Sequence, residues 1–315
     1  MPTEYREEAC KSALNRVKGM GFNWSLNPYM GCAHQCTFCY VRAFERRADR
    51  PSDDSYGASV RVKINVAQQL ERELVRRSWK HELVAIGAAT DPYQPAEGRY
   101  MLTRQCLAVL ASHANPVSII TRGPMIVRDI DQLTALARRA DVSVNFSIPT
   151  LDKDIWRYTE PHTAPPMQRL KALQKLVDAG VRAGVGVAPI LPGLSDKPEL
   201  LADVVSAARD HGATHVWANV LYLRPGTREH FLDKLGQIWP ELLPMYEKLY
   251  ANGRAYLPDA ETRPRRARVN GLAQRFEIAD RRRLRIMPVA LPPPVEQLQL
   301  VLSDDVKARA AQTAA

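Results

Sequence analysis

Short runs of β-forming residues alternate with helical patterns through most of this chain, and no other feature limits its fold as strongly. The β-forming runs span residues 83–89, 116–122, 142–148, 181–190 and 214–220. Apolar residues at helical spacing lie before and between them, in residues 65–77, 126–139, 165–180 and 198–212. With a further strand expected within residues 23–30, the pattern predicts about six βα units and a parallel sheet. Such a sheet is either open and doubly wound or an incomplete TIM-like barrel, and both place active sites at the carboxyl ends of the strands.

Two predicted strands carry small or polar residues on one face, although a central parallel strand is usually apolar on both faces. These residues are Ser143, Asn145 and Ser147 in one strand, and Gly184, Gly186 and Ala188 in the other. One interpretation is that small residues relieve crowding in a barrel core. The other, which we favour, is that they line a roomy and partly polar interior suited to a bound cofactor.

The composition is that of an ordinary globular protein with an excess of positive charge. Of its 315 residues 45% are hydrophobic and 25% are charged, and the formal net charge is +10. The sequence has no run of 18 apolar residues to predict a membrane span, and the N-terminal stretch MPTEYREEACK lacks the apolar core of a secretory signal. We therefore expect a cytoplasmic protein whose five cysteines are reduced thiols.

Three of the five cysteines crowd into one short loop. Cys32, Cys36 and Cys39 lie in MGCAHQCTFCY with the spacing C-x3-C-x2-C. Clustered reduced thiols more often bind metal or do chemistry than form disulfides. A zinc site takes four ligands and would need His34 as the fourth, within one small loop. A [4Fe–4S] cluster held by three thiolates instead leaves one iron without a protein ligand, and an open position marks a reactive centre.

With Phe38 before the third cysteine, the loop resembles the C-x3-C-x-φ-C signature of the radical S-adenosylmethionine (radical SAM) superfamily. The resemblance covers about residues 22–250 and implies a partial (β/α)6 barrel with the cysteine loop after its first strand. It also implies two cofactors, a [4Fe–4S] cluster held by the three cysteines and S-adenosyl-L-methionine chelated to the open iron. In this superfamily the reduced cluster cleaves that cofactor to methionine and a 5′-deoxyadenosyl radical, which abstracts hydrogen from a substrate. Such chemistry implies an electron donor such as flavodoxin or ferredoxin as a partner.

Three segments, NPYMGCAHQCTFCYVR, TDPYQPAEGRY and IITRGP, are similar to the spore photoproduct lyase-like branch of that superfamily. The resemblance implies that Thr90 lies near the methionine part of the cofactor, Arg122 at its carboxylate and Ser147 at its sugar or carboxylate. We expect Phe38 and Asp91 to belong to the same cofactor site. An arginine can hold a carboxylate through two parallel hydrogen bonds. A turn or helix cap is the alternative role for Thr90 and Asp91, and a strand-end turn for Ser147.

One position departs from the lyase pattern. The lyase has a hydrogen-donating cysteine immediately before the strand-end hydroxyl residue, and this chain has Ala89 there. Alanine has no thiol hydrogen to transfer, so the repair cycle of the lyase lacks a part. Cys106, Tyr40 and Tyr93 are the remaining candidates for a catalytic role. Apolar neighbours in a predicted helix favour a buried structural role for Cys106.

Outside the predicted radical SAM core, the chain divides into three segments. Residues 1–21 form an N-terminal extension, and residues 251–288 are arginine-rich, with clusters at 263–268 and 281–283. The arginines either bind phosphate groups of a nucleic acid without reading sequence or pair with acidic residues of the core. Residues 289–315 begin proline-rich and are expected to form a linker and a flexible tail.

Three hypotheses for the function follow. The first is a radical SAM enzyme acting on a nucleic-acid base, in a lyase-like or repair-like reaction. The second is a radical SAM enzyme acting on a peptide, a protein or a small metabolite. The third is a zinc-binding nucleic-acid module without enzymatic activity. Fold alone does not name a substrate.

Overall fold

The structure, a computed structural model, describes residues 3–278 and 280, and its centre is a seven-stranded sheet. Six parallel strands follow one another in chain order: β3 (Trp24–Leu26), β6 (Val84–Ile86), β7 (Val117–Thr121), β8 (Val142–Ser147), β9 (Arg182–Ile190) and β10 (Val216–Val220). At the other edge β2 (Leu14–Arg16) pairs antiparallel with β3. The predicted partial (β/α)6 barrel is therefore confirmed, with β10 and β2 as the two ends of the sheet in the described part of the chain.

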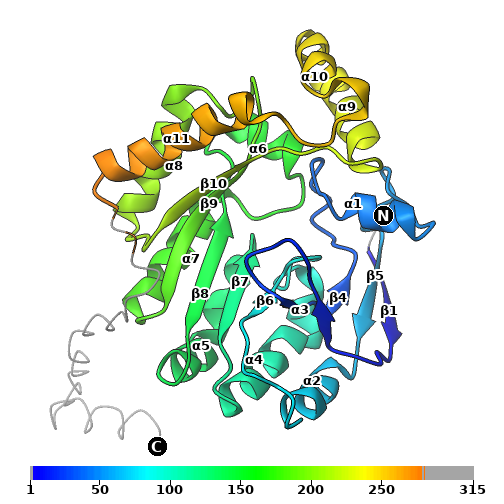
Figure 1. Ribbon diagram of the computed structural model, residues 1–315, viewed down its shortest axis with the longest axis vertical. Coiled ribbons are helices and arrows are strands. Elements are labelled where there is room, and N and C mark those ends of the chain that lie inside the picture. The colour runs from blue at the N-terminus through cyan, green and yellow to red at the C-terminus, as the bar shows by residue number, and fades with distance from the viewer. Residues whose placement is uncertain (1–2, 279, 281–315) are drawn as a thin grey trace, which may run out of the picture.

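Helices connect successive parallel strands and cover the outside of the sheet (Figure 1). They are α2 (Val66–Leu74), α3 (Pro95–Tyr100), α4 (Leu102–Ser112), α5 (Ile130–Ala137), α6 (Lys153–Thr159), α7 (Pro166–Asp178) and α8 (Pro198–Asp210). The helix predicted at 126–139 begins as a separate 3₁₀ helix, η1 (Pro124–Asp129). Proline opens α7 and α8 because its missing N–H costs nothing in a first turn. Every helix in the described residues is too short or too polar to serve as a membrane span.

A second sheet of three strands, which the sequence analysis did not predict, stands beside the barrel (Figure 1). Its order is β1 (Glu4–Glu8), β5 (Ser59–Lys63) and β4 (Tyr29–Met30). β1 comes from residues 1–21, which we expected to be an extension. Because β4 ends immediately before Gly31, this small sheet fixes where the cysteine loop begins.

Two glycines of β9 make room for large side chains of β10. A Cβ atom on Gly184 would lie 2.4 Å from the backbone oxygen of His215. A Cβ atom on Gly186 would lie 2.6 Å from the indole ring of Trp217. At these two positions the structure therefore supports the interpretation that small residues relieve crowding.

The polar face of β8 is paired deep in the barrel and open near its end. The side-chain oxygen of Asn145 accepts the indole N–H of Trp217 at 2.8 Å and lies 2.9 Å from the ring nitrogen Nε2 of His215. Ser147 and Ala188, nearer the carboxyl ends of β8 and β9, instead line a cavity. The interior room that we expected for a cofactor thus lies at the carboxyl ends of the strands.

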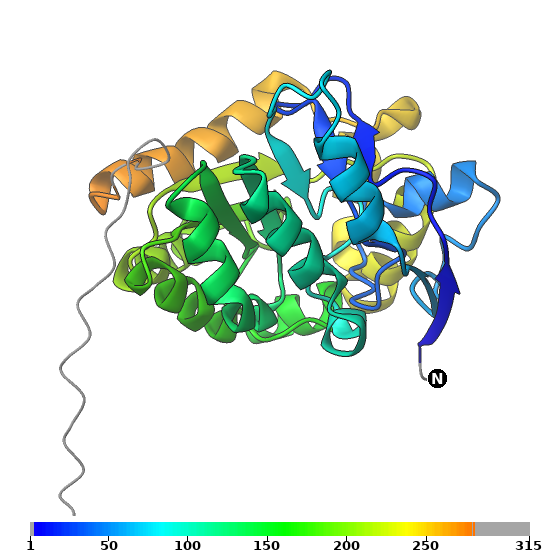
Figure 2. The same cartoon turned by 90° about the horizontal axis from the view of Figure 1, so that it is seen from below.

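The arginine-rich segment forms a long helix, α11 (Asp259–Arg275), after α9 (Thr227–Ile238) and α10 (Leu243–Leu249). α11 runs along β10 and beside α8 (Figures 1 and 2). Arg265 pairs with Asp196 at 2.9 Å, as expected if the arginines pair with acids of the core. Arg263 and Arg266 remain exposed to solvent. Arg281, Arg282 and Arg283, and the predicted linker and tail at 289–315, lie outside the described residues.

The tight contact at Gly186 makes a prediction about stability. Gly186→Ala should lower the free energy of unfolding by about 1–3 kcal/mol, because the added methyl group displaces the half-buried Trp217 indole from its packing on Gly186 and its hydrogen bond to Asn145. Gly271→Ala is the control, since nothing lies near that position in α11, and it should be neutral or raise stability by up to about 1 kcal/mol. Urea unfolding of both variants measures the difference, and equal stabilities would contradict the packing account.

Candidate active site

The three predicted metal ligands lie together in the loop between β4 and α1 (Arg42–Arg47). Cys32 and Cys36 are buried, Cys39 is half-buried, and all three line one small cavity of about 60 Å³. Burial raises the pKa of Cys36 to about 12 and the pKa of Cys32 well above its usual range. Without a metal these two thiols are therefore protonated at neutral pH, and binding a metal must release their protons.

The arrangement of these side chains suits a cluster better than a single ion. In the described part of the chain, no three His, Cys, Asp or Glu side chains converge to hold one metal ion. A zinc ion would draw each thiolate to about 2.3 Å, whereas a [4Fe–4S] cluster spreads three thiolates over three irons. Nδ1 of His34, the possible fourth zinc ligand, lies 3.4 Å from a carboxylate oxygen of Asp91 but outside hydrogen-bond geometry. The zinc alternative is thus not supported by the geometry.

The backbone of the cysteine loop is held by side chains that follow β6. The Thr90 hydroxyl donates to the carbonyl oxygen of Gly31 at 2.7 Å. The Gln94 amide donates to that same oxygen at 3.1 Å, and its own oxygen accepts the N–H of Ala33 at 3.0 Å. Thr90 also lines the small cavity, but its hydroxyl is already used in this contact. Gln94 was missed by the sequence analysis, because a glutamine four residues after Thr90 carries no recognisable signal.

Asp91 ties the end of β6 to the end of β7. Its carboxylate accepts the N–H of Tyr93 at 2.9 Å, the hydroxyl of Thr121 at 2.7 Å and the N–H of Arg122 at 2.7 Å. Burial alone would raise the pKa of Asp91, but the nearby His34 and these donors hold it at about 2. Asp91 lines the small cavity, yet these contacts support the turn role that we gave as its alternative.

Arg122 immediately follows β7 and lines the small cavity with the cysteines. Its Nε donates to Glu160 at 2.5 Å, and its guanidinium lies 5.5 Å from the centre of the Phe38 ring. Glu160 is fully buried and also pairs with Arg169 at 3.1 Å. Burial alone would lower the pKa of Arg122, but Cys36 and Glu160 raise it above its usual range. Glu160 was missed because it stands alone in a loop, before a proline and outside any motif.

A larger cavity of about 210 Å³ adjoins the small one at the carboxyl ends of the strands. Six residues line both cavities: Cys36, Cys39, Tyr40, Gly87, Ile120 and Arg122. Phe38, Ser147, Trp217 and Tyr222 line the larger cavity as well. The Ser147 hydroxyl has no hydrogen-bond partner among the described residues, so it is available to a ligand. The structure thus gathers the cysteines, Phe38, Tyr40, Arg122 and Ser147 around connected space.

Two of the candidate catalytic residues lie elsewhere. Tyr93 is buried and donates its hydroxyl hydrogen to Asp129 at 3.1 Å. Cys106 is fully buried in α4 within the hydrophobic core. Neither lines the two cavities at the cysteines, whereas Tyr40 lines both and donates its hydroxyl hydrogen to the carbonyl oxygen of Ala88. Of the three candidates, only Tyr40 is placed at the site.

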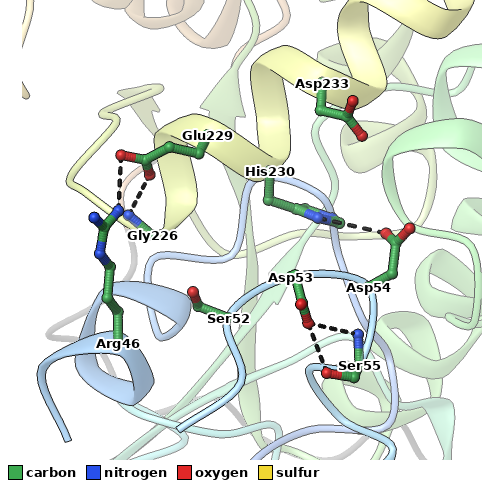
Figure 3. Close-up of a pocket in the computed structure, with 9 residues that line it drawn as sticks. All are labelled: Arg46, Ser52, Asp53, Asp54, Ser55, Gly226, Glu229, His230 and Asp233. Atoms are coloured by element: carbon green, nitrogen blue, oxygen red, sulfur yellow. Dashed lines mark hydrogen bonds and ion pairs between the residues drawn. The ribbon is translucent and has the colours of Figure 1, made fainter. Parts of the chain in front are cut away.

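A more open cavity of about 530 Å³ lies between α1 and α9 (Figure 3). Its charged side chains are mostly paired with one another, as Arg46 is with Glu229 at 2.8 Å. His230 lies 3.5 Å from Asp54, and burial lowers the pKa of His230 to about 4, so its ring is neutral at pH 7. No thiol or strand end contributes to its lining among the described residues, so we place the site at the cysteines instead.

Comparison with known proteins identifies the family of this chain. The profile of the radical SAM superfamily matches residues 26–205, which include the cysteine loop, β6, β7 and β8. An uncharacterized protein of Mycobacterium tuberculosis is 37% identical over 278 residues, covering 87% of this chain and 82% of that protein. An uncharacterized protein of Acidianus two-tailed virus is 29% identical over 255 residues, covering 73% of this chain and 82% of that protein.

Solved structures of spore photoproduct lyase share the fold. A mutant lyase with bound AdoMet and dinucleoside spore photoproduct aligns with a TM-score of 0.66 and 15% sequence identity, covering 86% of this chain and 79% of that one. A lyase complexed with the dinucleoside spore photoproduct alone aligns equally well, with a TM-score of 0.66 and 15% identity. At this identity the likeness concerns the fold.

The thiol positions make a prediction about metal content. Cys32→Ala, Cys36→Ala and Cys39→Ala should each abolish the [4Fe–4S] cluster, because no other thiol lines the cavity among the described residues. Cys10→Ala and Cys106→Ala are matched controls and should keep about four irons per chain. Iron analysis and visible absorption after anaerobic reconstitution measure the outcome. An intact cluster in any of the three loop variants would refute the assignment.

The position of Arg122 makes a prediction about cofactor affinity. If its guanidinium pairs with the methionyl carboxylate, Arg122→Ala should weaken S-adenosylmethionine binding by about 1.5–3 kcal/mol, the range for hydrogen bonds to charged groups. Arg122→Lys keeps the charge without the two-pronged geometry and should lie between alanine and wild type. Calorimetry gives the affinities, and iron analysis checks that cluster content is unchanged. Equal affinity in all three proteins would leave Arg122 with a structural role, through Glu160 and the carbonyl oxygen of Ala188.

Proposed function

Because the chain belongs to the radical SAM superfamily, we propose that it is a radical SAM enzyme that abstracts hydrogen from a nucleic-acid base. In this superfamily a [4Fe–4S] cluster and S-adenosylmethionine together supply a 5′-deoxyadenosyl radical. The single observation that carries the proposal is the connected space at the carboxyl ends of the strands, onto which the cysteine thiols, Arg122 and Ser147 all open.

The chemistry of each lining residue assigns it a role. The thiolates of Cys32, Cys36 and Cys39 would hold the [4Fe–4S] cluster, which would supply the electron that cleaves S-adenosylmethionine. Arg122 stays charged and pairs with the cofactor carboxylate, while Glu160 fixes the direction of its guanidinium. The unpaired Ser147 hydroxyl donates a hydrogen bond to the same cofactor. A flavodoxin or ferredoxin supplies the electron.

A stacked pair of tyrosines supports a base as the substrate class. Tyr222 lines the larger cavity, and Tyr256 stacks on it with ring centroids 5.1 Å apart. Tyr256 is 53% exposed, and Arg224 donates to its hydroxyl oxygen at 2.7 Å. Exposed aromatic rings beside arginines bind bases by stacking and phosphates by charge. The exposed Arg263 and Arg266 of α11 follow Tyr256 closely in the chain and add to this positive charge.

The reaction that we propose differs from the repair cycle implied by the lyase resemblance. Ala89 has no thiol hydrogen to transfer, and Cys106 is buried in the core away from both cavities. Of the three candidate residues, Tyr40 is the one that lies at the site, and its hydroxyl holds a transferable hydrogen toward the carbonyl oxygen of Ala88. We propose that the 5′-deoxyadenosine product returns hydrogen at the end of the reaction, either directly or through Tyr40, whose phenoxyl radical then takes a hydrogen atom from 5′-deoxyadenosine.

Isotope transfer tests the substrate class directly. Reduced, reconstituted protein is incubated with S-adenosylmethionine and with nucleic-acid, protein or small-molecule fractions from deuterated cells. Deuterium should appear in 5′-deoxyadenosine with the nucleic-acid fraction. Transfer from the protein or small-molecule fraction would support the second hypothesis, a peptide or metabolite substrate. Absence of any 5′-deoxyadenosine would contradict the enzymatic proposal itself.

The tyrosine pair makes a prediction about binding. Tyr256→Ala should weaken binding of a fluorescent single-stranded oligonucleotide by about 1–3 kcal/mol, the contribution of one base stacked on an aromatic ring. An abasic strand of the same length should bind wild type and variant alike, because it has no ring to stack. Tyr158→Ala is the control, since Tyr158 is 46% exposed but packs against Trp239 away from the cavity. Equal losses for normal and abasic strands would exclude stacking.

A further inference from the structure

Tyr56 places a hydroxyl group against one of the three cysteines. Its oxygen lies 3.6 Å from the sulfur of Cys39, and its side chain is buried with 2% of the residue exposed. No other side chain of the described residues hydrogen-bonds the sulfur of Cys32, Cys36 or Cys39. The three sulfur atoms are therefore unequal, because one alone meets a side-chain hydrogen-bond donor.

Several contacts fix the position of this hydroxyl. The guanidinium of Arg42 lies 4.6 Å from the centre of the Tyr56 ring and donates to the carbonyl oxygen of Cys36 at 3.3 Å. The same guanidinium donates to the carbonyl oxygens of Ser52 and Asp53, in the loop that leads to Tyr56. One buried cation thus joins the cysteine loop to the segment that carries Tyr56.

The next residue allows the chain to pass close to the cysteine loop. Gly57 has a φ of +82°, and a Cβ atom there would lie 2.3 Å from the carbonyl oxygen of Cys32. Only glycine takes this conformation without strain and leaves the contact open. The Tyr56 ring therefore has little freedom to move away from Cys39.

The direction of the hydrogen bond follows from the state of the sulfur. A thiolate that ligates iron carries no proton, so it can only accept, and the tyrosine hydroxyl must donate. Hydrogen bonds to cluster sulfurs, net charge and solvent exposure set the reduction potential of an iron–sulfur cluster. A donor at a thiolate favours the reduced, more negative cluster because it offsets the added electron.

We propose that Tyr56 donates a hydrogen bond to the Cys39 thiolate and thereby raises the reduction potential of the cluster. This inference rests on the proposed function, because it requires the three cysteines to hold that cluster. Tyr56 is a positioning residue that acts on the cluster through Cys39 without contacting the substrate. A more positive potential makes the cluster easier for a physiological electron donor to reduce.

Tyr56→Phe tests the proposal, because it removes the hydroxyl and keeps the ring beneath Arg42. At a fixed solution potential the ratio of reduced to oxidised cluster should fall about tenfold, a shift of about 59 mV toward more negative potential. Redox titration followed by electron paramagnetic resonance measures the shift. Tyr93→Phe is the matched control, since it removes a buried hydroxyl bound to Asp129, away from the cysteines, and should leave the potential unchanged.

A second variant, expected to shift the reduction potential in the opposite direction, keeps the test decisive if Tyr56→Phe binds iron poorly. Replacing Tyr56 by 3,5-difluorotyrosine strengthens the donor with little change of size, so the potential should rise above that of wild type. An unchanged potential in the loaded variants, or an equal shift in Tyr93→Phe, would overturn the proposal. Failure of the wild-type protein to bind about four irons would instead refute the proposed function, so the two failures are distinguishable.

Discussion

The site depends on hydrogen bonds between the cysteine loop and the segment that follows β6. Thr90 and Gln94 hold the Gly31 carbonyl oxygen, and Gln94 also accepts the N–H of Ala33. These groups are buried, so each broken bond would leave an unsatisfied polar atom at a cost of about 1–3 kcal/mol. The start of the loop, at Gly31 and Ala33, is held by these hydrogen bonds, while Cys36 and Phe38 further along pack in the hydrophobic core. The conformation at the start of the loop is therefore imposed by the neighbouring βα unit, which also fixes Arg122 through Asp91.

The charges around the cysteines are arranged to orient side chains more than to stabilise the fold. Glu160 is fully buried between Arg122 and Arg169, and removing charges from water offsets much of what their attraction gains. The arrangement instead fixes the orientation of the Arg122 side chain. Because its Nε is bound to Glu160, its remaining guanidinium nitrogens point in a fixed direction. Arg122, Arg169 and Glu160 together carry one net positive charge. This charge lies beside cysteine thiols that become negatively charged thiolates when they bind metal.

Two kinds of feature could be predicted from the sequence: elements that recur along the chain and residues at a fixed spacing. Six strands were recognisable because β-forming runs alternate with helices that begin at proline. The cysteine loop was recognisable because three cysteines at this spacing have few other uses. The roles of Glu160 and Tyr56 could not be predicted. Each residue lies outside the strands and helices, and its contact partner is distant in the sequence and is brought near only by folding. The small sheet was missed because β4 is two residues long and the β5 run SVRVK alternates too briefly. Thr90 and Asp91 show that a motif residue can support a site through the backbone of its neighbours.

The hydrogen bond between Gln94 and Gly31 cannot form until well after the cysteine loop has been synthesised. The two residues are 63 positions apart in the sequence. At a synthesis rate of about 5–20 residues per second, roughly 3–13 seconds pass between their additions to the nascent chain. During that interval the three thiols of the cysteine loop lack the later residues that will enclose them. Newly made chains therefore expose these three thiols to oxidants, whereas burial in the folded chain shields Cys32 and Cys36.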